Sequence, residues 1–510
     1  MSNTGEGTPP LAPTPDEPNY KQLMRNYISL IGLALAVVAI ANIIFLFILD
    51  ITSKQPSPYI GIFAYMIMPG VMMFGLALVP VGIAIQRNKL RRKDPSLPVF
   101  PRLDFNNPAQ RSTVAFFLSF VVIFMVVSAI GSYRAYEFTD STQFCGKLCH
   151  VVMHPEYTAH QASPHARVGC VDCHVGAGAG WYVRSKMSGM RQVFKVVLGT
   201  FPRPIGSPVE NLRPAPETCE QCHWPRKFWG AQLKVINHFG YDEKSTPRQL
   251  RLLIKTGGGD PNEGQASGIH WHMNIANTIN YASDAKRQVI PYVKIQDGKG
   301  GVTEYYAPNA NQAEIAKMTT KKMDCVDCHN RPTHIYMPPD RSVDQSLAAH
   351  RIDPSLPFAK QQGVTILTAD YKTTEEAVKA IGEKIPAYYA QTYPDVAKSK
   401  QREIQSMVAE LQRIFTQSIF PEMKVDWRTH PNNVGHFYSQ GCFRCHDGEH
   451  KSKDGKVITK DCNACHNLLG QDEAGVQLSG NILNNQFKHP VDLGDMAAVN
   501  CADCHTGGPQ

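Results

Sequence analysis

The chain of 510 residues contains 14 cysteines, and each successive pair of them is followed directly by a histidine. Two such thiols can add to the vinyl groups of a haem as thioethers, and the adjacent histidine can then ligate the iron. Zinc sites and disulfides would not require a histidine after every second cysteine. We therefore predict covalent c-type haem at six Cys-x-x-Cys-His units: Cys170, Cys173, His174; Cys219, Cys222, His223; Cys325, Cys328, His329; Cys442, Cys445, His446; Cys462, Cys465, His466; Cys501, Cys504, His505.

The seventh set of two cysteines and a histidine has a different spacing. In the stretch "FCGKLCHVVMHPEY", three residues separate Cys145 from Cys149, and His150 follows. Cysteine pairs of this spacing would be weak evidence by themselves, but the chain uses its other cysteines only in haem motifs. We therefore predict a seventh haem at this position, which makes seven c-type haems in total.

Twelve further histidines are available as second axial ligands, which is more than seven irons need. Irons with both axial positions filled transfer electrons, whereas open irons do chemistry, so this supply favours an electron carrier. We expect distal ligands at positions close to motif cysteines, and also at His238 and at one of His270 and His272 from farther along the chain. The candidates close to motif cysteines are His165, His334, His436 and His489.

Three apolar runs precede the haem motifs: Tyr27–Leu49, Tyr59–Ile85 and Val114–Ile130. Each is long enough to cross a hydrocarbon core of roughly 30 Å as a helix. A cleaved signal peptide is the alternative for the first run. That run is longer than a usual signal-peptide core, and no small-x-small cleavage site follows it, so we expect an uncleaved membrane anchor in the lipid bilayer.

The loops between these runs predict the orientation of the anchor. Residues 86–111 contain seven lysines and arginines, whereas residues 50–58 contain one. The positive-inside rule then places 86–111 and the N-terminus in the cytoplasm, and everything after about residue 133 in the periplasm, outside the bacterial inner membrane. The runs contain no histidine, so they cannot ligate a b-type haem inside the bilayer.

These observations predict a membrane anchor of three transmembrane helices followed by a mostly helical and irregular multihaem cytochrome c domain with little β structure. The formal net charge of +8 gives no reason to expect a nucleic-acid partner, because the haem propionates would reverse it. In residues 366–420, apolar spacing predicts two helices divided near Pro394, which brace the fourth and fifth haems. The expected parts are a disordered tail (1–20), the anchor (21–135), a tetrahaem module (136–340), a helical spacer (341–430) and a trihaem module (431–510).

The span from Phe144 to about Gly259 resembles the NapC/NirT family of membrane-anchored quinol dehydrogenases. The motifs that carry the resemblance are "FCGKLCHVVMHPEY", "SPHARVGCVDCHVGAGAGW", "SKMSGMRQVF" and "LRPAPETCEQCHWPRKFWG". The resemblance implies that membrane quinol such as menaquinol is oxidised near the first haem. Electrons would then pass through bis-histidine haems to periplasmic c-type cytochromes or a terminal reductase. Two of the three helices and the three C-terminal motifs depart from the smaller family members, which have one helix and four haems.

The resemblance also implies candidate residues for the quinol site. Met153 matches the family's methionine ligand of the first haem, although it stands three residues after His150 instead of two. Whether His150, Met153 or both ligate that iron stays open. Lys186 matches the family's lysine after the second motif. The family's acid has no counterpart, since no Asp or Glu lies between His174 and Val209, so Glu156 or a propionate would have to take the protons.

Two other functions are compatible with a multihaem chain. A reductase of nitrite, hydroxylamine or sulfur oxyanions would need an iron with an open position, which a Cys-x-x-Cys-Lys motif often marks, and the chain has no such motif. An electron-transfer subunit of a larger respiratory complex would receive electrons from a partner protein instead of from quinol.

Overall fold

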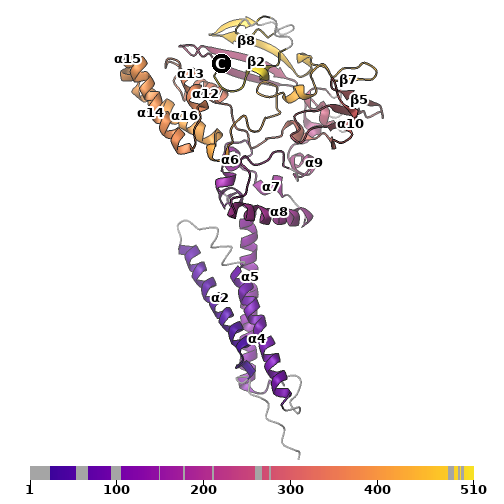
Figure 1. Cartoon of the computed structure of the whole chain (residues 1–510), viewed down its shortest axis with the longest axis vertical. Helices are drawn as coiled ribbons and strands as arrows, with labels where there is room; N and C mark the ends of the chain where they lie inside the picture. The colour runs from indigo at the N-terminus through magenta and orange to yellow at the C-terminus, as the bar shows by residue number, and fades with distance from the viewer. Residues whose placement is uncertain are drawn as a thin grey trace, which may run out of the picture. The chain divides into compact units, whose positions relative to one another are not determined.

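The structure of the chain divides into an N-terminal unit of long helices and a larger C-terminal unit. The computed structural model describes residues 23–52, 67–93, 105–148, 150–175, 179–209, 212–258, 267–274, 277–479, 487–491, 494 and 499–509. It divides into two units, Met1–Leu148 and Cys149–Gln510 (Figure 1). The N-terminal unit contains α2 (Tyr27–Thr52), α4 (Met68–Arg91), α5 (Pro108–Thr139) and the π-helical turn η2 (Phe144–Leu148). The predicted tail 1–20 lies outside the described residues.

Helices α2 and α4 are antiparallel neighbours, and their backbones approach closely at two glycines. A Cβ atom on Gly32 would lie 2.5 Å from the carbonyl oxygen of Gly75, and a Cβ on Gly75 would lie 2.6 Å from that of Gly32. The hydroxyl of Ser29 donates to the carbonyl of Val79 at 3.0 Å. Small residues at a helix interface with a hydrogen bond across it are the means by which helices associate in lipid, where burial of apolar surface gives no driving force.

Among the described helices, α2 over Tyr27–Ile48 and α4 over Met68–Arg91 are long and apolar enough to cross a membrane. The first and third predicted runs lie within α2 and α5, and the described part of the second run lies within α4. The structure therefore confirms two candidate spans. The count of three membrane helices stays a prediction.

The C-terminal unit consists of short helices around the haem motifs, two sheets and a bundle of longer helices. Its helices up to the fourth motif are α6 (His150–Gln161), α7 (Cys170–His174), α8 (Ala179–Val197), α9 (Ala215–Thr218), η3 (Cys219–Gln221), η4 (Pro225–Lys227), η5 (Ile269–Met273), α10 (Gln312–Ile315) and α11 (Cys325–Cys328). The later helices are α12 (Pro339–Ala348), α13 (Ala359–Thr368), α14 (Thr374–Thr392), α15 (Pro394–Ser399), α16 (Gln401–Ser418), η6 (Pro421–Met423), η7 (Gly441–Arg444), η8 (Cys462–Ala464) and α17 (Cys501–Cys504).

Both sheets are antiparallel, and each joins strands that are distant in the sequence. The first sheet has the order β1-β2-β8-β9 and the second the order β6-β3-β4-β5-β7. The strands are β1 (Gln232–Phe239), β2 (Pro247–Ile254), β3 (Thr278–Ala282), β4 (Tyr292–Gln296), β5 (Val302–Tyr306), β6 (Thr320–Lys322), β7 (Lys451–Ser452), β8 (His466–Glu473) and β9 (Val476–Ser479). The expectation of little β structure is thus corrected. Pairing such as that of β2 with β8 joins segments far apart in the chain, which local patterns do not reveal.

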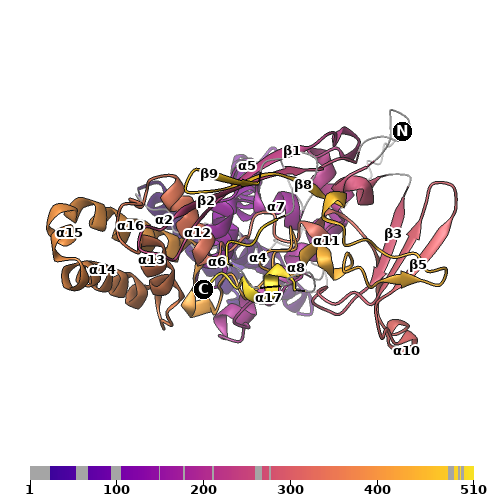
Figure 2. The ribbon, with the colours of Figure 1, turned by 90° about the horizontal axis from the view of Figure 1, so that it is seen from above.

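Helices α12 to α16 form the largest apolar core of the described residues. Its buried side chains include Val343, Leu367, Ile381, Met407 and Phe415. The chain divides at Tyr393, directly before Pro394, whose fixed φ angle suits the first turn of α15. Figure 2 shows this bundle at one end of the unit and the sheet of β3 and β5 at the other. The bundle contains four helices over residues 359–418, where the sequence predicted two over 366–420.

A smaller apolar cluster holds α6, the helix that follows the first haem motif. Val152 and Ala159 of α6 pack with Tyr336, Phe420 and Met423. These two α6 residues lie two helical turns apart on one face, so the cluster fixes how the helix is rotated about its axis. The rest of α6, including Met153, is thereby held in a defined direction.

The buried carboxylate of Glu410 in α16 is the centre of an ionic cluster whose two arginines, Arg351 and Arg413, are half-exposed. Its carboxylate accepts hydrogen bonds from Ser346 Oγ at 2.6 Å, Arg351 Nε at 2.7 Å and Arg413 Nη2 at 2.6 Å. Burial by itself would raise the pKa of Glu410, but the hydrogen bonds from Arg413, Arg351 and Ser346 outweigh it and lower the pKa to about 2. The ionised carboxylate therefore stabilises the folded state.

We predict that Glu410→Gln destabilises the bundle by about 2 kcal/mol at pH 7, because two arginines lose their charged acceptor. A pKa that is depressed in the folded state gives stability that is complete above the usual value of 4.5 and is lost as the pH falls toward 2. The difference in the free energy of unfolding between the native chain and the variant should therefore shrink as the pH falls from 4.5 to 2. Thermal unfolding of the full chain in detergent, followed by circular dichroism, measures it.

Glu383→Gln is the matched control, since the Glu383 side chain is 68% exposed and only 4.0 Å from Lys379. It should change the free energy of unfolding by less than about 0.5 kcal/mol. Equal effects of the two substitutions would show that the Glu410 cluster does not stabilise the bundle.

Candidate haem sites

The six regular motifs each form one short helical turn. In four of them the amide of the motif histidine donates to the carbonyl of the first cysteine, at 2.8 to 3.0 Å, in the units that contain His223, His329, His446 and His505. Residues three and four apart lie on the same side of such a turn. Each turn therefore presents two sulfur atoms and an imidazole on one side, as thioether attachment with axial ligation requires.

An aspartate before the second cysteine closes three of these turns. The carboxylate of Asp172 accepts from the amide of Gly169 at 2.8 Å, that of Asp327 from the amide of Asp324 at 2.9 Å, and that of Asp503 from the amide of Asn500 at 3.1 Å. The carboxylate satisfies an amide at the start of the turn that has no partner within the helix. The residues between the cysteines thus help to fix the geometry of the motif.

The first motif begins in a π-helical turn. Cys145 lies in η2, and Cys149 lies outside the described residues. A π-helix bonds residue i to i+5 and takes up about one more residue per turn than an α-helix. A cysteine spacing that is longer by one residue is suited to such a turn, so the π-helix gives a physical reason for the unusual motif.

Each of the six regular motif histidines lies opposite a second histidine. The distances between ring centroids are 5.8 to 6.3 Å, for the pairs His174 with His334, His223 with His165, His329 with His270, His446 with His272, His466 with His436, and His505 with His489. Two imidazoles that ligate one metal from opposite sides need ring centres about 6 Å apart, because each bond from metal to nitrogen is about 2 Å long. The pairs therefore fit an iron between them.

Hydrogen bonds at the other ring nitrogen set the tautomer of four paired histidines. Their Nδ1 atoms lie 2.6 to 3.1 Å from backbone carbonyl oxygens, which can only accept, so Nδ1 must carry the proton. Nε2 then has the lone pair that a metal ligand needs. The four bonds are His270 to Thr256, His272 to Ile269, His334 to Glu156, and His446 to Thr459.

The surroundings of the paired histidines favour their neutral form. Burial lowers the pKa of His334 to about 4, even though the nearby Glu156 acts in the opposite direction. Burial also lowers the pKa of His272, His436 and His466. A neutral imidazole keeps its lone pair at neutral pH, so these rings are ready to ligate a metal.

Cysteines of consecutive motifs are neighbours in space. Burial raises the pKa of Cys325 to about 11, and Cys219 of the preceding motif adds to this effect. In the same way burial, with Cys442 as the next cause, raises the pKa of Cys328 to about 11. Such neighbours link the second motif to the third, the third to the fourth, and so on to the seventh: Cys173 with Cys219, Cys219 with Cys325, Cys328 with Cys442, Cys442 with Cys465, and Cys462 with Cys501.

Some predicted site residues have other partners or lie outside the described part. His238 approaches Asp344 with Nδ1 at 3.3 Å from the carboxylate, and among the described ring pairs it faces no motif histidine. Both His270 and His272 face motif histidines, where the sequence predicted only one of them. The side chains of His150 and Lys186 are outside the described residues, and Met153 is half-buried on α6.

Glu156 lies beside His334, the histidine that faces His174 of the second motif. Its carboxylate is 3.3 Å from the guanidinium of Arg331 and 3.2 Å from Nδ1 of His334. Arg331 also donates to the carbonyl of His334 at 2.6 Å. Sequence reasoning missed Arg331, although its place in "CHNRPTH", between a motif histidine and His334, could have suggested a supporting role.

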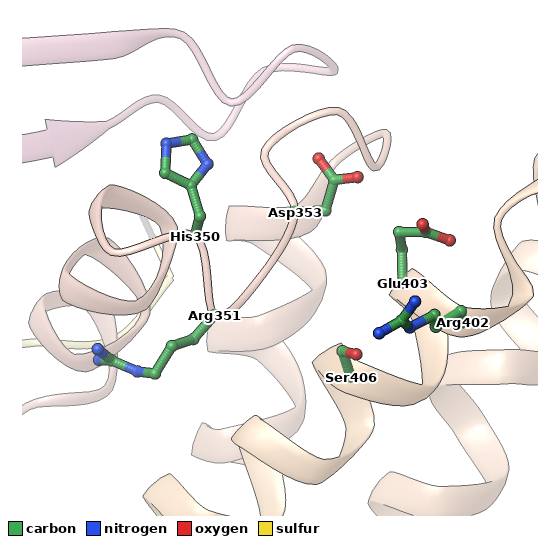
Figure 3. A pocket seen from close by; sticks show the side chains of 6 residues that line it. All are labelled: His350, Arg351, Asp353, Arg402, Glu403 and Ser406. Carbon is green, nitrogen blue, oxygen red and sulfur yellow. The ribbon is translucent and has the colours of Figure 1, made fainter.

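Two histidines outside the pairs, His160 and His450, are satisfied by the protein, and His350 is exposed at its surface. The two ring nitrogens of His160 contact the Val168 carbonyl and Gln161, and those of His450 contact Asp447 and the Ile290 carbonyl. His350 lies at a shallow surface pocket that contains no cysteine (Figure 3). The other residues that line this pocket are Arg351, Asp353, Arg402, Glu403 and Ser406.

Two parts of the chain match family models of cytochromes c. Residues 107–204 match the model of the NapC/NirT cytochrome c family, N-terminal region, and residues 436–509, which contain the last three motifs, match that of cytochrome c3. No solved structure matches the chain.

Two curated proteins are similar to the chain. It is 48% identical to the cytochrome c-type protein ImcH of Geobacter sulfurreducens over 485 residues, which cover 94% of this chain and 95% of that protein. It is 27% identical to the cytochrome c-type protein NrfH of Wolinella succinogenes over 133 residues, which cover 26% of this chain and 75% of that protein. The chain therefore belongs to the NapC/NirT family of multihaem membrane cytochromes c.

Proposed function

We propose that the chain is a heptahaem quinol dehydrogenase of the bacterial inner membrane. It oxidises membrane quinol at the periplasmic face and passes the electrons to periplasmic c-type cytochromes or a terminal reductase. The cysteine motifs support the number of seven haems, and the resemblance to the NapC/NirT family supports quinol as the electron donor.

The six histidine pairs are the observation that carries this proposal. A bound haem would supply an iron that gains and loses one electron at a time. Each pair would fill both axial positions of that iron and leave no position for a small substrate. The pairs therefore favour electron transfer over reduction of nitrite, hydroxylamine or sulfur oxyanions at these six sites.

The order of the motifs supports a single route. Because cysteines of consecutive motifs are neighbours, the second to seventh sites follow one another in space as they do in the sequence. We propose that electrons enter at the first motif, next to the membrane anchor in the sequence, and leave near the C-terminal motifs.

We propose that Met153, Lys186 and Glu156 belong to the quinol site at the first motif. Oxidation of menaquinol releases two protons and two electrons. Lys186 would hold a quinol oxygen through a hydrogen bond, and Met153 would ligate the first iron. Glu156 or a haem propionate would receive the two protons, and the two electrons would pass one at a time into the chain of haems. The contacts of Glu156 to Arg331 and His334 would hold its carboxylate in place and link this site to the second motif.

The proposed membrane topology places the N-terminus in the cytoplasm and the haem motifs in the periplasm. It takes α5 as a third membrane helix beside α2 and α4. The basic residues between α4 and α5 support this orientation through the positive-inside rule. Periplasmic haem motifs would also lie in the compartment where c-type haem is attached.

We predict that a reduced menaquinol analogue reduces the purified holoprotein in detergent, as followed by the optical spectrum of the haems. Lys186→Gln should slow this reduction by about tenfold or more, because the quinol loses a charged ammonium donor and a neutral amide is a weaker one. Lys195→Gln, which removes another lysine of α8, is the matched control and should leave the rate unchanged.

Three results would contradict this prediction. Absence of reduction by the analogue would exclude the quinol role, and reduction only in the presence of a further protein would favour the subunit of a larger complex. Turnover of nitrite, hydroxylamine or a sulfur oxyanion by the protein alone would favour the reductase.

We predict that His436→Ala opens the distal position of the sixth iron and produces a high-spin ferric signal in electron paramagnetic resonance. The reason is that His436 is the ring opposite His466. His350→Ala is the control, because His350 lies at a surface pocket and should leave every signal unchanged. A His436→Ala protein with seven haems and no new high-spin signal would exclude His436 as a ligand.

A further inference from the structure

Two of the proposed distal ligands come from a single turn of 3-10 helix. The turn η5 has the sequence Ile-His-Trp-His-Met, and His270 and His272 lie on either side of Trp271. His270 faces His329 of the fourth motif at 6.3 Å, and His272 faces His446 of the fifth motif at 5.8 Å. With three residues per turn, neighbours two apart point in different directions, so one turn can serve two different motifs.

We infer that Trp271 is the positioning residue that fixes His270 and His272 together, and that η5 is the joint between the fourth and fifth haem sites. The inference rests on the proposed ligation of haem by the histidine pairs. It adds a role for a residue that neither carries a haem nor ligates an iron.

The indole of Trp271 is anchored in the core of the second sheet. It packs against the buried cluster of Ile279, Tyr281, Ile290 and Val293. Its ring centroid is 5.9 Å from that of His272, with the two planes at 79°. The side chain therefore ties η5 to β3 and β4 and lies in edge contact with one of the two imidazoles.

The backbone of Trp271 is also held on both sides. Its amide donates to the carbonyl of Gly268 at 3.0 Å. Its carbonyl accepts from the amide of Asn274 at 3.1 Å and from Nδ2 of Asn277 at 3.2 Å. These bonds close the turn around the tryptophan, so a displacement of Trp271 would move both neighbouring histidines.

The base of η5 is fixed to the end of β2. The amide of His270 and its Nδ1 atom both contact the carbonyl of Thr256, at 3.0 and 2.9 Å. Gly268 has a φ of +85°, and a Cβ atom there would lie 2.6 Å from the carbonyl oxygen of Lys255, so only glycine suits this position. The amide of Lys255 in turn donates to the carbonyl of Cys465 in the sixth motif at 2.8 Å.

The turn η5 connects two haem motifs that are far apart in the sequence. The fourth and fifth motifs are separated in the sequence by the helices α12 to α16, which form an apolar core of their own. Cys328 and Cys442 are nevertheless neighbours in space. The turn η5 contributes a ligand on each side of this junction, so it sets the relative position of the two haem sites directly.

The two pairs have different ring orientations, which makes them distinguishable by spectroscopy. The planes of His270 and His329 are nearly parallel, at 4°, whereas those of His272 and His446 are nearly perpendicular, at 82°. Low-spin ferric haem with parallel imidazole planes gives a rhombic signal in electron paramagnetic resonance. Perpendicular planes give a single signal at large g value, so the fourth and fifth sites should differ in kind.

We predict that Trp271→Ala in the full-length holoprotein shifts or removes one rhombic and one large-g signal together, by more than half of their intensity. Trp271→Phe should restore both, because a second aromatic ring can fill the same core position. Trp427→Ala is the matched control: Trp427 donates to the carbonyl of Thr506 near the seventh motif and should leave these two signals unchanged.

A change of only one signal, of neither, or a failure of Trp271→Phe to restore them would overturn the inference. If Trp271→Ala does not accumulate with seven haems, His270→Met and His272→Met replace it. The first should remove only the rhombic signal and the second only the large-g signal, and any other assignment would equally overturn the inference. Reduction by the menaquinol analogue tests the proposed function separately, since it can persist while these signals fail to respond.

Discussion

The arrangement of the haem-binding unit depends on one distance, the separation of about 6 Å between two imidazole rings that share a metal. The cysteine motif supplies one of the rings locally, within five residues. The second ring has to come from elsewhere, and it has to be held with its proton on the nitrogen that faces away from the metal. The strands and turns of the unit meet this requirement, since backbone carbonyls at Thr256 and Ile269 orient the second rings of two different pairs.

This constraint explains why the unit has two kinds of interior. Helices α12 to α16 bury aliphatic and aromatic side chains against one another in the ordinary way. Around the motifs, in contrast, the side chains that converge are cysteines and histidines, and the apolar mass has to come from the macrocycles. The weak apolar periodicity of the segments around the motifs follows from this division of the interior.

The local chemistry of the sites could be predicted from the sequence, because spacing within one turn determines it. The seven motifs and the candidates His165, His334, His436 and His489 were found in this way, and the structure brings all four opposite motif histidines. The assignment of partners could not be predicted. His334 follows the fourth motif in the sequence but faces His174 of the second, and sheets that join distant segments decide such matches. His238 stays a predicted ligand: its Nδ1 lies 3.3 Å from the carboxylate of Asp344, and its ring lies beside Phe437.

The direction in which the pairs run along the chain has a consequence for assembly. In five of the six pairs the second histidine precedes its motif in the sequence, and only His174 has a partner, His334, that comes later. A chain is synthesised from its N-terminus, so five motifs emerge after the ring that will face them. Of these six motifs, only the second has to wait for about a third of the chain to follow, and until then its iron would lack the ligand that makes it inert toward oxygen and other small molecules.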